Sequence, residues 1–324
     1  MLVKDIQFAL RMFARNPGFT TVIVLTLAVG LGMTMTVWGV IDRVLLDPLP
    51  YPGAERIVEI RMAEPGGDAV GFPMSVFAFQ DIVDQSRSFQ SLAVCFNENV
   101  NLTGDSTPER VRGSRVSAEF FDVMGVYPQV GRGFRPDEDR PGSEPVVVLA
   151  NGLWRRRFGG DPDTLGHKVM VNGQPHTVVG VAPDGFSYPG DVEIWLPIAI
   201  EWTEEGRGHG WVVGYGRMKP HVTPAEVRAD LERISAWQQA EFPEIHEGRT
   251  LIATPIKEII VGPVRSSLTI LFGAVCCVLL IAAANVTILL SVRTVARQRE
   301  VALRQALGAS RGRMVCQLVT ESTL

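Results

Sequence analysis

The stretch "SSLTILFGAVCCVLLIAAANVTILLSV", residues 266–292, decides the fold class, because no charged side chain interrupts it. A second uncharged window, "FTTVIVLTLAVGLGMTMTVWGVI", covers residues 19–41. An α-helix rises about 1.5 Å per residue, so about 20 apolar residues cross a bilayer. We therefore predict a transmembrane helix in each window. A cleaved signal peptide is the alternative for residues 19–41, but signal cores are only about 7–15 residues long and no A-x-A-like site follows.

Charges outside the two windows predict how the chain is oriented. The flanks at residues 1–18 and 293–324 hold nine of the 31 basic residues but only three of the 35 acidic ones. Basic flanks stay on the cytoplasmic side of a membrane. We therefore expect both termini in the cytoplasm and residues 42–265 outside it. Residues 1–18 show apolar and basic faces at helical spacing, which predicts an amphipathic helix at the inner surface.

Residues 42–265 have the pattern of an α+β domain. Short β-branched runs predict strands at 56–60, 145–150, 168–173, 176–182, 193–198, 211–218 and 249–260. Asn172-Gly173 predicts a hairpin turn between the third and fourth of these runs. Helices are predicted at 75–86, 117–125, 151–160 and 223–242. The last is the clearest, because Thr223 can cap it and Glu226 completes a capping box.

The order of these elements predicts two subdomains, one inserted in the other. The outer subdomain takes about 52–112 plus 213–264, and the inserted one takes about 113–212. Cys95 is the only cysteine of this segment, so no disulfide within it is expected and a hydrophobic core must hold it together.

Motifs for catalysis or cofactor binding are missing from the sequence. The five histidines form no H-x-x-x-H pair, and neither G-x-S-x-G nor the phosphate-binding G-x-x-x-x-G-K-[ST] occurs. We therefore predict no catalytic residue, no metal site and no bound cofactor. If ATP is used, another chain binds it. The basic run at 155–158 lies in an acidic segment, so no nucleic-acid partner is expected.

The two apolar windows carry residues that suit helix–helix packing. Ala28, Gly32 and Thr36 are four residues apart, and Gly39 lies near the same face. Such small residues let helices approach closely, and the amide of Asn285 would seek a partner helix. These faces imply further helices, from the same chain or another one. The alternative is that these small residues are scattered as in any membrane helix and mark no packing face.

The pattern of residues 293–318 predicts a basic and apolar amphipathic helix interrupted at Gly308, where Ser310 could cap a second helix. Two interpretations remain open for this segment. Its arginines could contact anionic lipid headgroups, or its surface could dock a cytoplasmic partner.

Several stretches, in order, resemble one known family. They are "FARNPGFTTVIVLTLAVGLG", "DPLPYPGAERIVEI", "SAEFFDVMGVYPQVGRGF", "VVVLANGLWRRRFGGD", "LGHKVMVNGQPHTVVGV" and "REVALRQALGAS". Together they are similar to the MacB/FtsX-like permeases of ABC systems, and most similar to the duplicated orphan permeases described from acidobacteria. The resemblance covers essentially the whole chain.

The resemblance implies a MacB-like periplasmic core domain at 42–265 and the start of an FtsX-like permease domain at 293–324. It also implies that the helix after the second window contacts a separate nucleotide-binding subunit, which would hold the ATP. Carried over by residue, the ATPase-coupling positions are Arg299, Glu300, Ala302, Arg304, Ala306, Leu307, Gly308 and Ala309. Members of the family have two further spans, so the sequence is expected to be a fragment that lacks them.

We therefore expect a non-enzymatic permease subunit of an ABC-type export or mechanotransmission system in the bacterial inner membrane. Its expected partners are the ATPase, the lipid bilayer and further permease helices of the full-length chain or a dimer mate. The alternative is a two-span receptor with a periplasmic sensing domain. The glycine break at Gly308 argues against the signalling coiled coil that a receptor would need. A membrane-anchored periplasmic enzyme is the weakest hypothesis.

Overall fold

The structure is a computed structural model that describes residues 17–42, 52–64, 71–104, 107–200 and 207–306. Its contacts divide the chain into two compact units. The helical unit contains Met1–Pro48 and Val261–Leu324, and the outer domain contains Leu49–Ile260. Most of the predicted amphipathic helix at residues 1–18 lies outside the described residues.

Two long helices make up the described part of the helical unit: α2 (Pro17–Ile41) and α8 (Ile256–Ala306). Their segments Val24–Ile41 and Ile256–Ile288 are long and apolar enough to cross a membrane, and only 11% of each apolar window is buried inside the protein. The helices predicted at 19–41 and 266–292 are confirmed as helices. Their exposed apolar side chains would be unfavourable in water, so they fit a lipid environment.

The start of α8 corrects one sequence expectation. The strand predicted at 249–260 ends at Pro255, where β10 (Thr250–Pro255) gives way directly to the helix. The prediction of strand for 256–260 was wrong because the isoleucines there were taken as β-formers. Ile256 and Ile260 are four residues apart and pack on the core of the outer domain, so helical periodicity and burial override β-propensity.

One mixed sheet forms the centre of the outer domain. Its strands follow the order β10-β1-β9-β2-β3-β8-β5-β7-β4, and β6 pairs with β2 and β7. The pairs β3–β8 and β5–β7 are parallel, and the other pairs are antiparallel. Besides β10, the strands are β1 (Ile57–Ala63), β2 (Phe89–Thr103), β3 (Glu109–Val116), β4 (Val130–Gly131), β5 (Val146–Leu149), β6 (Lys168–Val171), β7 (Gln174–Val181), β8 (Ile194–Pro197) and β9 (Val213–Met218). The expected α+β class is confirmed.

Strands β2 and β3 are the longest elements that the sequence analysis missed. Strand β2 has 15 residues and pairs with β9, β3 and β6, so it runs through most of the domain. Its second half, "NENVNLT", is rich in asparagine, which β-propensity disfavours, although pairing with β3, and with β6 at its end, stabilises it there. The boundary expected at 112/113 falls inside β3, and the sheet is continuous across it. The division into two subdomains stays a prediction.

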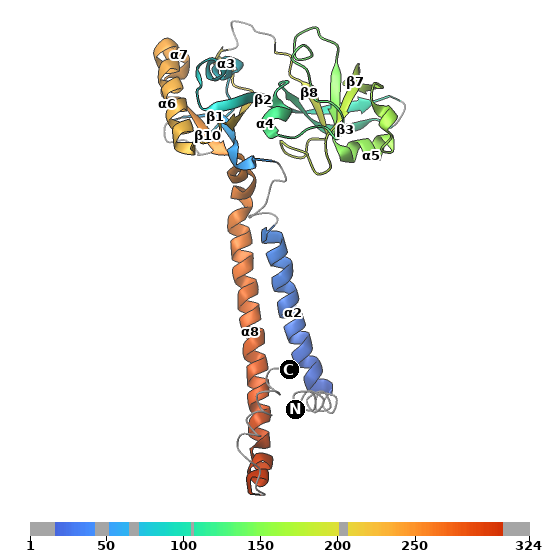
Figure 1. The fold of residues 1–324 in the computed structure, drawn as a ribbon, viewed down its shortest axis with the longest axis vertical. Coiled ribbons are helices and arrows are strands. Elements are labelled where there is room, and N and C mark those ends of the chain that lie inside the picture. Colours follow the sequence, from blue (N-terminus) through green and yellow to red (C-terminus); the bar gives the residue numbers. More distant parts are fainter. Residues whose placement is uncertain (1–16, 43–51, 65–70, 105–106, 201–206, 307–324) are drawn as a thin grey trace. The chain divides into compact units, whose positions relative to one another are not determined.

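Helices cover the two ends of the sheet separately. Near β10 and β1 lie α3 (Val76–Gln85), α6 (Pro224–Glu241) and the short α7 (Pro243–His246), whereas α5 (Asn151–Phe158) covers the β5–β7 end (Figure 1). The short α4 (Phe120–Met124) lies between them. Three buried clusters follow this arrangement: one around Ile82 and Leu231, one around Leu149 and Leu153, and an aromatic one around Phe120, Trp195 and Tyr215.

Local sequence signals are confirmed at the best-defined element ends. The hydroxyl of Thr223 accepts a hydrogen bond from the backbone N–H of Glu226, and the Glu226 carboxylate accepts one from the backbone N–H of Thr223. Asn172 and Gly173 both have positive φ, as the predicted turn between β6 and β7 requires. These two signals are short-range, which is why the sequence predicts them correctly.

Candidate functional site

The predicted coupling residues lie around the end of α8. Arg299, Glu300, Ala302, Arg304 and Ala306 fall within the helix. Leu307, Gly308 and Ala309 lie outside the described residues. The structure therefore places the first five on one helix that continues from the second apolar segment, and their contact with an ATPase stays a prediction.

The predicted helix-packing residues are exposed in this chain. Ala28, Gly32, Thr36 and Gly39 on α2 and Asn285 on α8 all lie on the surface of the helical unit. A Cβ atom on Gly32 or Gly39 would meet no atom within 4 Å. The Thr36 hydroxyl donates to the Gly32 carbonyl oxygen at 2.8 Å, so its polar group is satisfied within the helix. The face is free for another helix, and its role in packing stays a prediction.

The contact between α2 and α8 uses a different glycine, Gly30. A Cβ atom there would lie 3.3 Å from Leu279 Cδ1 and 3.5 Å from Ala282 Cβ. The rings of Trp38 and Phe272 add a contact with centroids 5.9 Å apart. The sequence analysis missed Gly30, because spacing alone does not tell which of several glycines on a helix faces the neighbour present.

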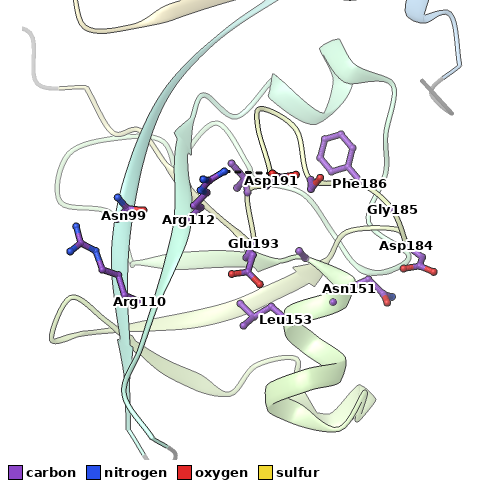
Figure 2. Close-up of a pocket in the computed structure, with 14 residues that line it drawn as sticks. Asn99, Arg110, Arg112, Asn151, Leu153, Asp184, Gly185, Phe186, Asp191 and Glu193 are labelled. Carbon is purple, nitrogen blue, oxygen red and sulfur yellow. Dashed lines mark ion pairs between the residues drawn. The ribbon is translucent and has the colours of Figure 1, made fainter. Parts of the chain in front are cut away.

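The outer domain contains a pocket of about 710 Å³ between strands β2 and β3, the start of α5 and the loop 184–193 (Figure 2). Its walls differ in chemistry. Asn99, Arg110 and Arg112 stand on the strand side, whereas Asn151 and Asp184 lie on the opposite side. The arginines reach this surface because strand residues alternate between faces, and both are exposed while Val111 between them is buried.

The side chain of Asn151 is the unusual feature of this pocket. It is only 1% exposed, yet neither its amide nitrogen nor its amide oxygen has a hydrogen-bond partner. Asn151 is the first residue of α5, and the N-cap residue Ala150 has no side chain that could bond the free N–H groups of the first turn. A buried polar group without partners costs about 1–3 kcal/mol. The start of α5 therefore carries several unused hydrogen-bonding groups.

Most charged groups around the pocket are already paired. Glu193 accepts from Arg156 at 2.8 Å, and Asp191 lies 3.5 Å from Arg112. For Arg110 and Asp184, no ion pair forms among the residues that the structure describes. One cation on the strand side and one carboxylate on the opposite side thus remain for a ligand.

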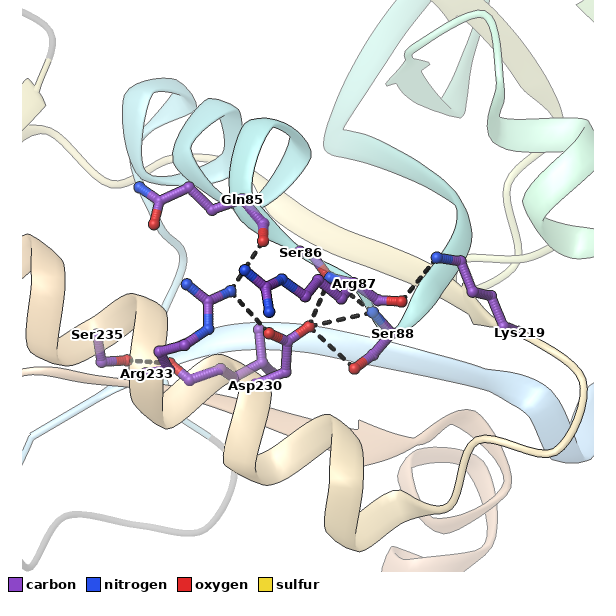
Figure 3. A network of polar contacts seen from close by, with 9 residues as sticks. Gln85, Ser86, Arg87, Ser88, Lys219, Asp230, Arg233 and Ser235 are labelled. Carbon is purple, nitrogen blue, oxygen red and sulfur yellow. Dashed lines mark hydrogen bonds and ion pairs between the residues drawn. The ribbon is translucent and has the colours of Figure 1, made fainter.

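A second polar site lies around Asp230 on α6, and its carboxylate is hydrogen-bonded, unlike the Asn151 amide (Figure 3). One carboxylate oxygen accepts hydrogen bonds from the backbone N–H groups of Arg87 and Ser88 and from the hydroxyls of Ser86 and Ser88, at 2.8–3.1 Å. The other accepts from Arg233 at 2.8 Å. Partial burial alone would raise the pKa of Asp230, but these hydrogen bonds outweigh burial and hold it at about 2. The network joins α6 to the turn between α3 and β2, which is a structural role.

A buried cluster around Glu59 is also fully bonded. Its carboxylate accepts from the hydroxyls of Tyr188 and Tyr215, at 3.1 and 3.0 Å, and pairs with Arg61. Burial raises the pKa of both tyrosines. Burial also raises the pKa of Cys95 to about 12, so this thiol stays protonated and unreactive. The cluster holds strands β1, β2 and β9 together and offers no free group for chemistry.

Metal binding finds no support among the described residues, where no group of three or more histidine, cysteine, aspartate or glutamate side chains converges. Of the histidines, His246 is buried with both ring nitrogens unpartnered. Burial and the nearby Arg207 lower its pKa, so it remains neutral. The sequence analysis pointed to none of the pocket residues. The one available signal was a helix starting at Asn151 without a capping side chain before it.

Comparison with known proteins gives the same identification as the sequence pattern. The family model of the MacB-like periplasmic core domain matches residues 20–234, and that of the FtsX-like permease C-terminal domain matches residues 272–324. The "Macrolide export ATP-binding/permease protein MacB" of Burkholderia thailandensis is 26% identical over 286 residues, 84% of this chain and 40% of that protein. Its namesake from Escherichia coli K12 is 22% identical over 335 residues, 99% of this chain and 50% of that protein. The chain thus spans about half the length of the curated relatives it matches.

Two solved structures of extracytoplasmic regions are partly similar to this chain. The periplasmic region of MacB from Actinobacillus actinomycetemcomitans superposes with a TM-score of 0.49 at 15% identity, over 65% of this chain and 94% of that one. The extracellular domain of the noncanonic ABC-type transporter YknZ gives 0.45 at 14% identity, over 60% and 99%. The family match over 20–234 covers well over half of the sequence and leads into the permease match along the chain. The chain belongs to the MacB/FtsX-like family of ABC transporter permeases, with a MacB-like periplasmic core domain.

Proposed function

We propose that this chain is a permease subunit that couples a separate cytoplasmic ATPase to movement of its periplasmic domain. The observation that carries the proposal is the order of its parts. An apolar helix, a periplasmic core domain and a second apolar helix follow one another, and the permease match begins inside the second helix. Because α8 continues to Ala306, five of the eight residues expected to meet the ATPase lie on the helix that contains the second apolar segment.

The charge distribution supports one orientation for this arrangement. Both termini lie in the cytoplasm and the outer domain in the periplasm, since the basic flanks would otherwise have to cross the membrane. ATP is bound by another subunit or another part of the full-length protein, because this sequence has no phosphate-binding loop. Export or mechanotransmission would then follow from helix movement, without a catalytic residue in this chain.

The orientation can be tested with cysteine labelling in intact cells. Asp137→Cys, at an exposed position of the outer domain, should react with a membrane-impermeant maleimide, whereas Arg304→Cys should react only after lysis. Cys276, Cys277 and Cys316 are first replaced by serine, and the remaining native thiol, Cys95, is buried. Equal labelling of both positions before lysis would contradict the proposed orientation.

The coupling itself is tested by photo-crosslinking from position 307 of the full-length protein in native membranes. A crosslink to a soluble ATPase is expected. The matched control is a crosslinker at Ile270, which is 70% exposed on the apolar part of α8 and should label lipid or other membrane helices. Crosslinks from position 307 to lipid alone, or to a signalling protein, would overturn the proposal.

Substitutions at two glycines of α2 test whether further permease helices pack against it. Gly32→Leu meets open space in this chain, so loss of assembly in that variant would reveal a neighbour from elsewhere. Gly30→Leu would instead push against Leu279 and disturb the contact with α8. If Gly32→Leu assembles and functions as the unchanged protein does, the proposed packing face is wrong.

A further inference from the structure

The imidazole of His246, on the short helix α7, is buried in the outer domain without a hydrogen-bond partner. His246 is 2% exposed, and both of its ring nitrogens are unpartnered. Its ring meets that of Phe242 edge to face, with the centroids 6.5 Å apart. A neutral imidazole carries one donor and one acceptor, whereas the protonated ring carries two donors and a charge. Protonation would therefore add a buried charge where neither nitrogen has an acceptor, which is unfavourable.

The charged groups around His246 also oppose a positive charge on it. Arg207, in the segment before β9, and Arg249, in the turn after α7, both act against protonation. Asp81 on α3 favours it, but this carboxylate already accepts from Arg207 and from the Gln238 amide, each at 2.9 Å. The acidic side chains near α7 in the sequence are exposed: Glu241, Glu244 and Glu247. Two cations therefore face His246, and the buried acid beside it is already engaged.

The side chains around His246 are the ones that hold α7 in place. The Arg207 guanidinium lies 3.8 Å from the centroid of the Phe242 ring and 5.1 Å from that of Phe77 on α3. Phe242 also contacts Trp237 on α6, with ring centroids 6.0 Å apart. Helix α7 has only four residues, too few to be stable without tertiary contacts. Its position therefore depends on these contacts, and a charged imidazole would repel Arg207 among them.

The burial of His246 gives the attachment of α7 a direction in pH. Burial first, and Arg207 next, lower the pKa of His246 below its ordinary value of 6.5. If α7 detaches, the imidazole regains water and its ordinary pKa. The detached form therefore binds a proton at a higher pH than the attached form does. The stability of the attached form is fully present above about pH 6.5 and falls as the pH drops below that value.

We propose that His246 is an acid-sensitive switch: α7 stays attached to α6 and, through Arg207, to α3 at neutral pH, and protonation of the buried imidazole releases it. The outer domain would then change its surface when its surroundings become acidic, as histidine-based pH sensors do. This inference goes beyond the proposed ATPase coupling and does not depend on it.

Hydrogen–deuterium exchange of the full chain in lipid nanodiscs, read by mass spectrometry on peptides that cover α7, measures the release. The rates are corrected for the intrinsic pH dependence of amide exchange. Between pH 7.5 and pH 5 we expect the α7 amides to exchange about ten- to thirtyfold faster, because the detached form gains a proton on a group with an ordinary histidine pKa. The amides of β5, whose side chains belong to other buried clusters, should change less than about twofold.

Two substitutions remove the titrating group. His246→Leu and His246→Phe cannot be protonated, so both should keep α7 protected at pH 7.5 and lose its response to acid. The phenylalanine variant keeps a ring beside Phe242, which separates loss of the charge from loss of packing. The matched control is His167→Gln, at an exposed histidine just before β6, and it should respond to acid like the unchanged chain.

A direct titration of His246 does not depend on whether a variant folds. Hydrogen exchange at the imidazole carbon, followed by mass spectrometry in the unchanged chain, gives the pKa of this ring. We expect a value below the ordinary 6.5.

Three results would overturn the proposal. Unchanged protection of α7 between pH 7.5 and pH 5 would show that acid does not release it. A response that persists in both His246 variants, or disappears in His167→Gln, would assign the effect to another group. A His246 pKa at or above 6.5 would show that the fold stabilises the charged ring. None of these results bears on the crosslink expected at position 307, so failure of one proposal leaves the other intact.

Discussion

Two polar sites of the outer domain, one at Asp230 and one at Asn151, differ in how completely they are bonded. Asp230 accepts five hydrogen bonds and holds two elements together (Figure 3). Asn151 is as well shielded from water but accepts and donates none. Burial alone therefore does not tell whether the fold supplies a polar group with hydrogen-bond partners, although most buried polar groups in proteins have them.

Of the substitutions that test this comparison, Asp230→Ala is expected to change the free energy of unfolding most. It leaves the N–H groups of Arg87 and Ser88 without their acceptor, and we expect a loss of about 3 kcal/mol in the free energy of unfolding. Urea unfolding of the full chain in detergent, followed by tryptophan fluorescence, measures it. Glu232→Ala, an exposed neighbour on α6, is the control and should change stability by less than about 0.5 kcal/mol. Equal effects would remove the structural role assigned to Asp230.

Lowering the pH should also reduce the stability that the Asp230 network provides. Its pKa is about 2 in the fold, against an ordinary value of 3.8. A depressed carboxyl pKa contributes stability that is present above the unfolded value and lost as pH falls toward the folded one. We expect a loss of about 1–2 kcal/mol between pH 5 and pH 2, after allowing for partial solvent screening. The same unfolding experiment with Asp230→Asn should show a shallower dependence over this range, and an identical slope would contradict the assignment.

Substitution of Asn151 should change stability with the opposite sign. Asn151→Leu keeps the branching of the side chain and removes two unpartnered polar atoms, so we expect a gain of about 1 kcal/mol. Asn151→Ala checks that the larger leucine is not overpacked. Chemical unfolding of both variants beside Asp230→Ala gives the contrast directly. A loss in both Asn151 variants would make the two sites alike.

The smallest effect is expected for Gly152→Ala, which tests whether the space beside the start of α5 is open. Gly152→Ala adds a methyl group into free space within a helix, where alanine is favoured over glycine. The expected gain is about 0.5–1 kcal/mol, measured as a rise in melting temperature. Gly180→Ala is the contrasting variant, because its Cβ atom would clash with the Arg132 carbonyl oxygen and should destabilise the protein. A loss of stability in Gly152→Ala would show that this end of the pocket is closed.

The sequence predicted elements whose signals are local. The hairpin at Asn172-Gly173 and the capping box of α6 each depend on contacts within a few residues, and both are confirmed. Strand β2 was missed because its Asn-rich half is stabilised by pairing with other strands, including the distant β6, where Val171 lies opposite Leu102. The start of α8 at Ile256 was missed for the same reason, since burial against the outer domain favours the helix there.

The sequence by itself determined that two uncharged helices flank an α+β domain of the MacB-like family along the chain, because hydropathy over about 20 residues and the order of motifs need no tertiary contact. Only the tertiary structure decided which polar groups are satisfied. Asp230 meets the turn at Ser86 and Ser88 more than 140 positions away, whereas Asn151 meets no partner. Hydrogen bonding depends on atoms within about 3 Å in space, and sequence distance carries no information about which atoms those are.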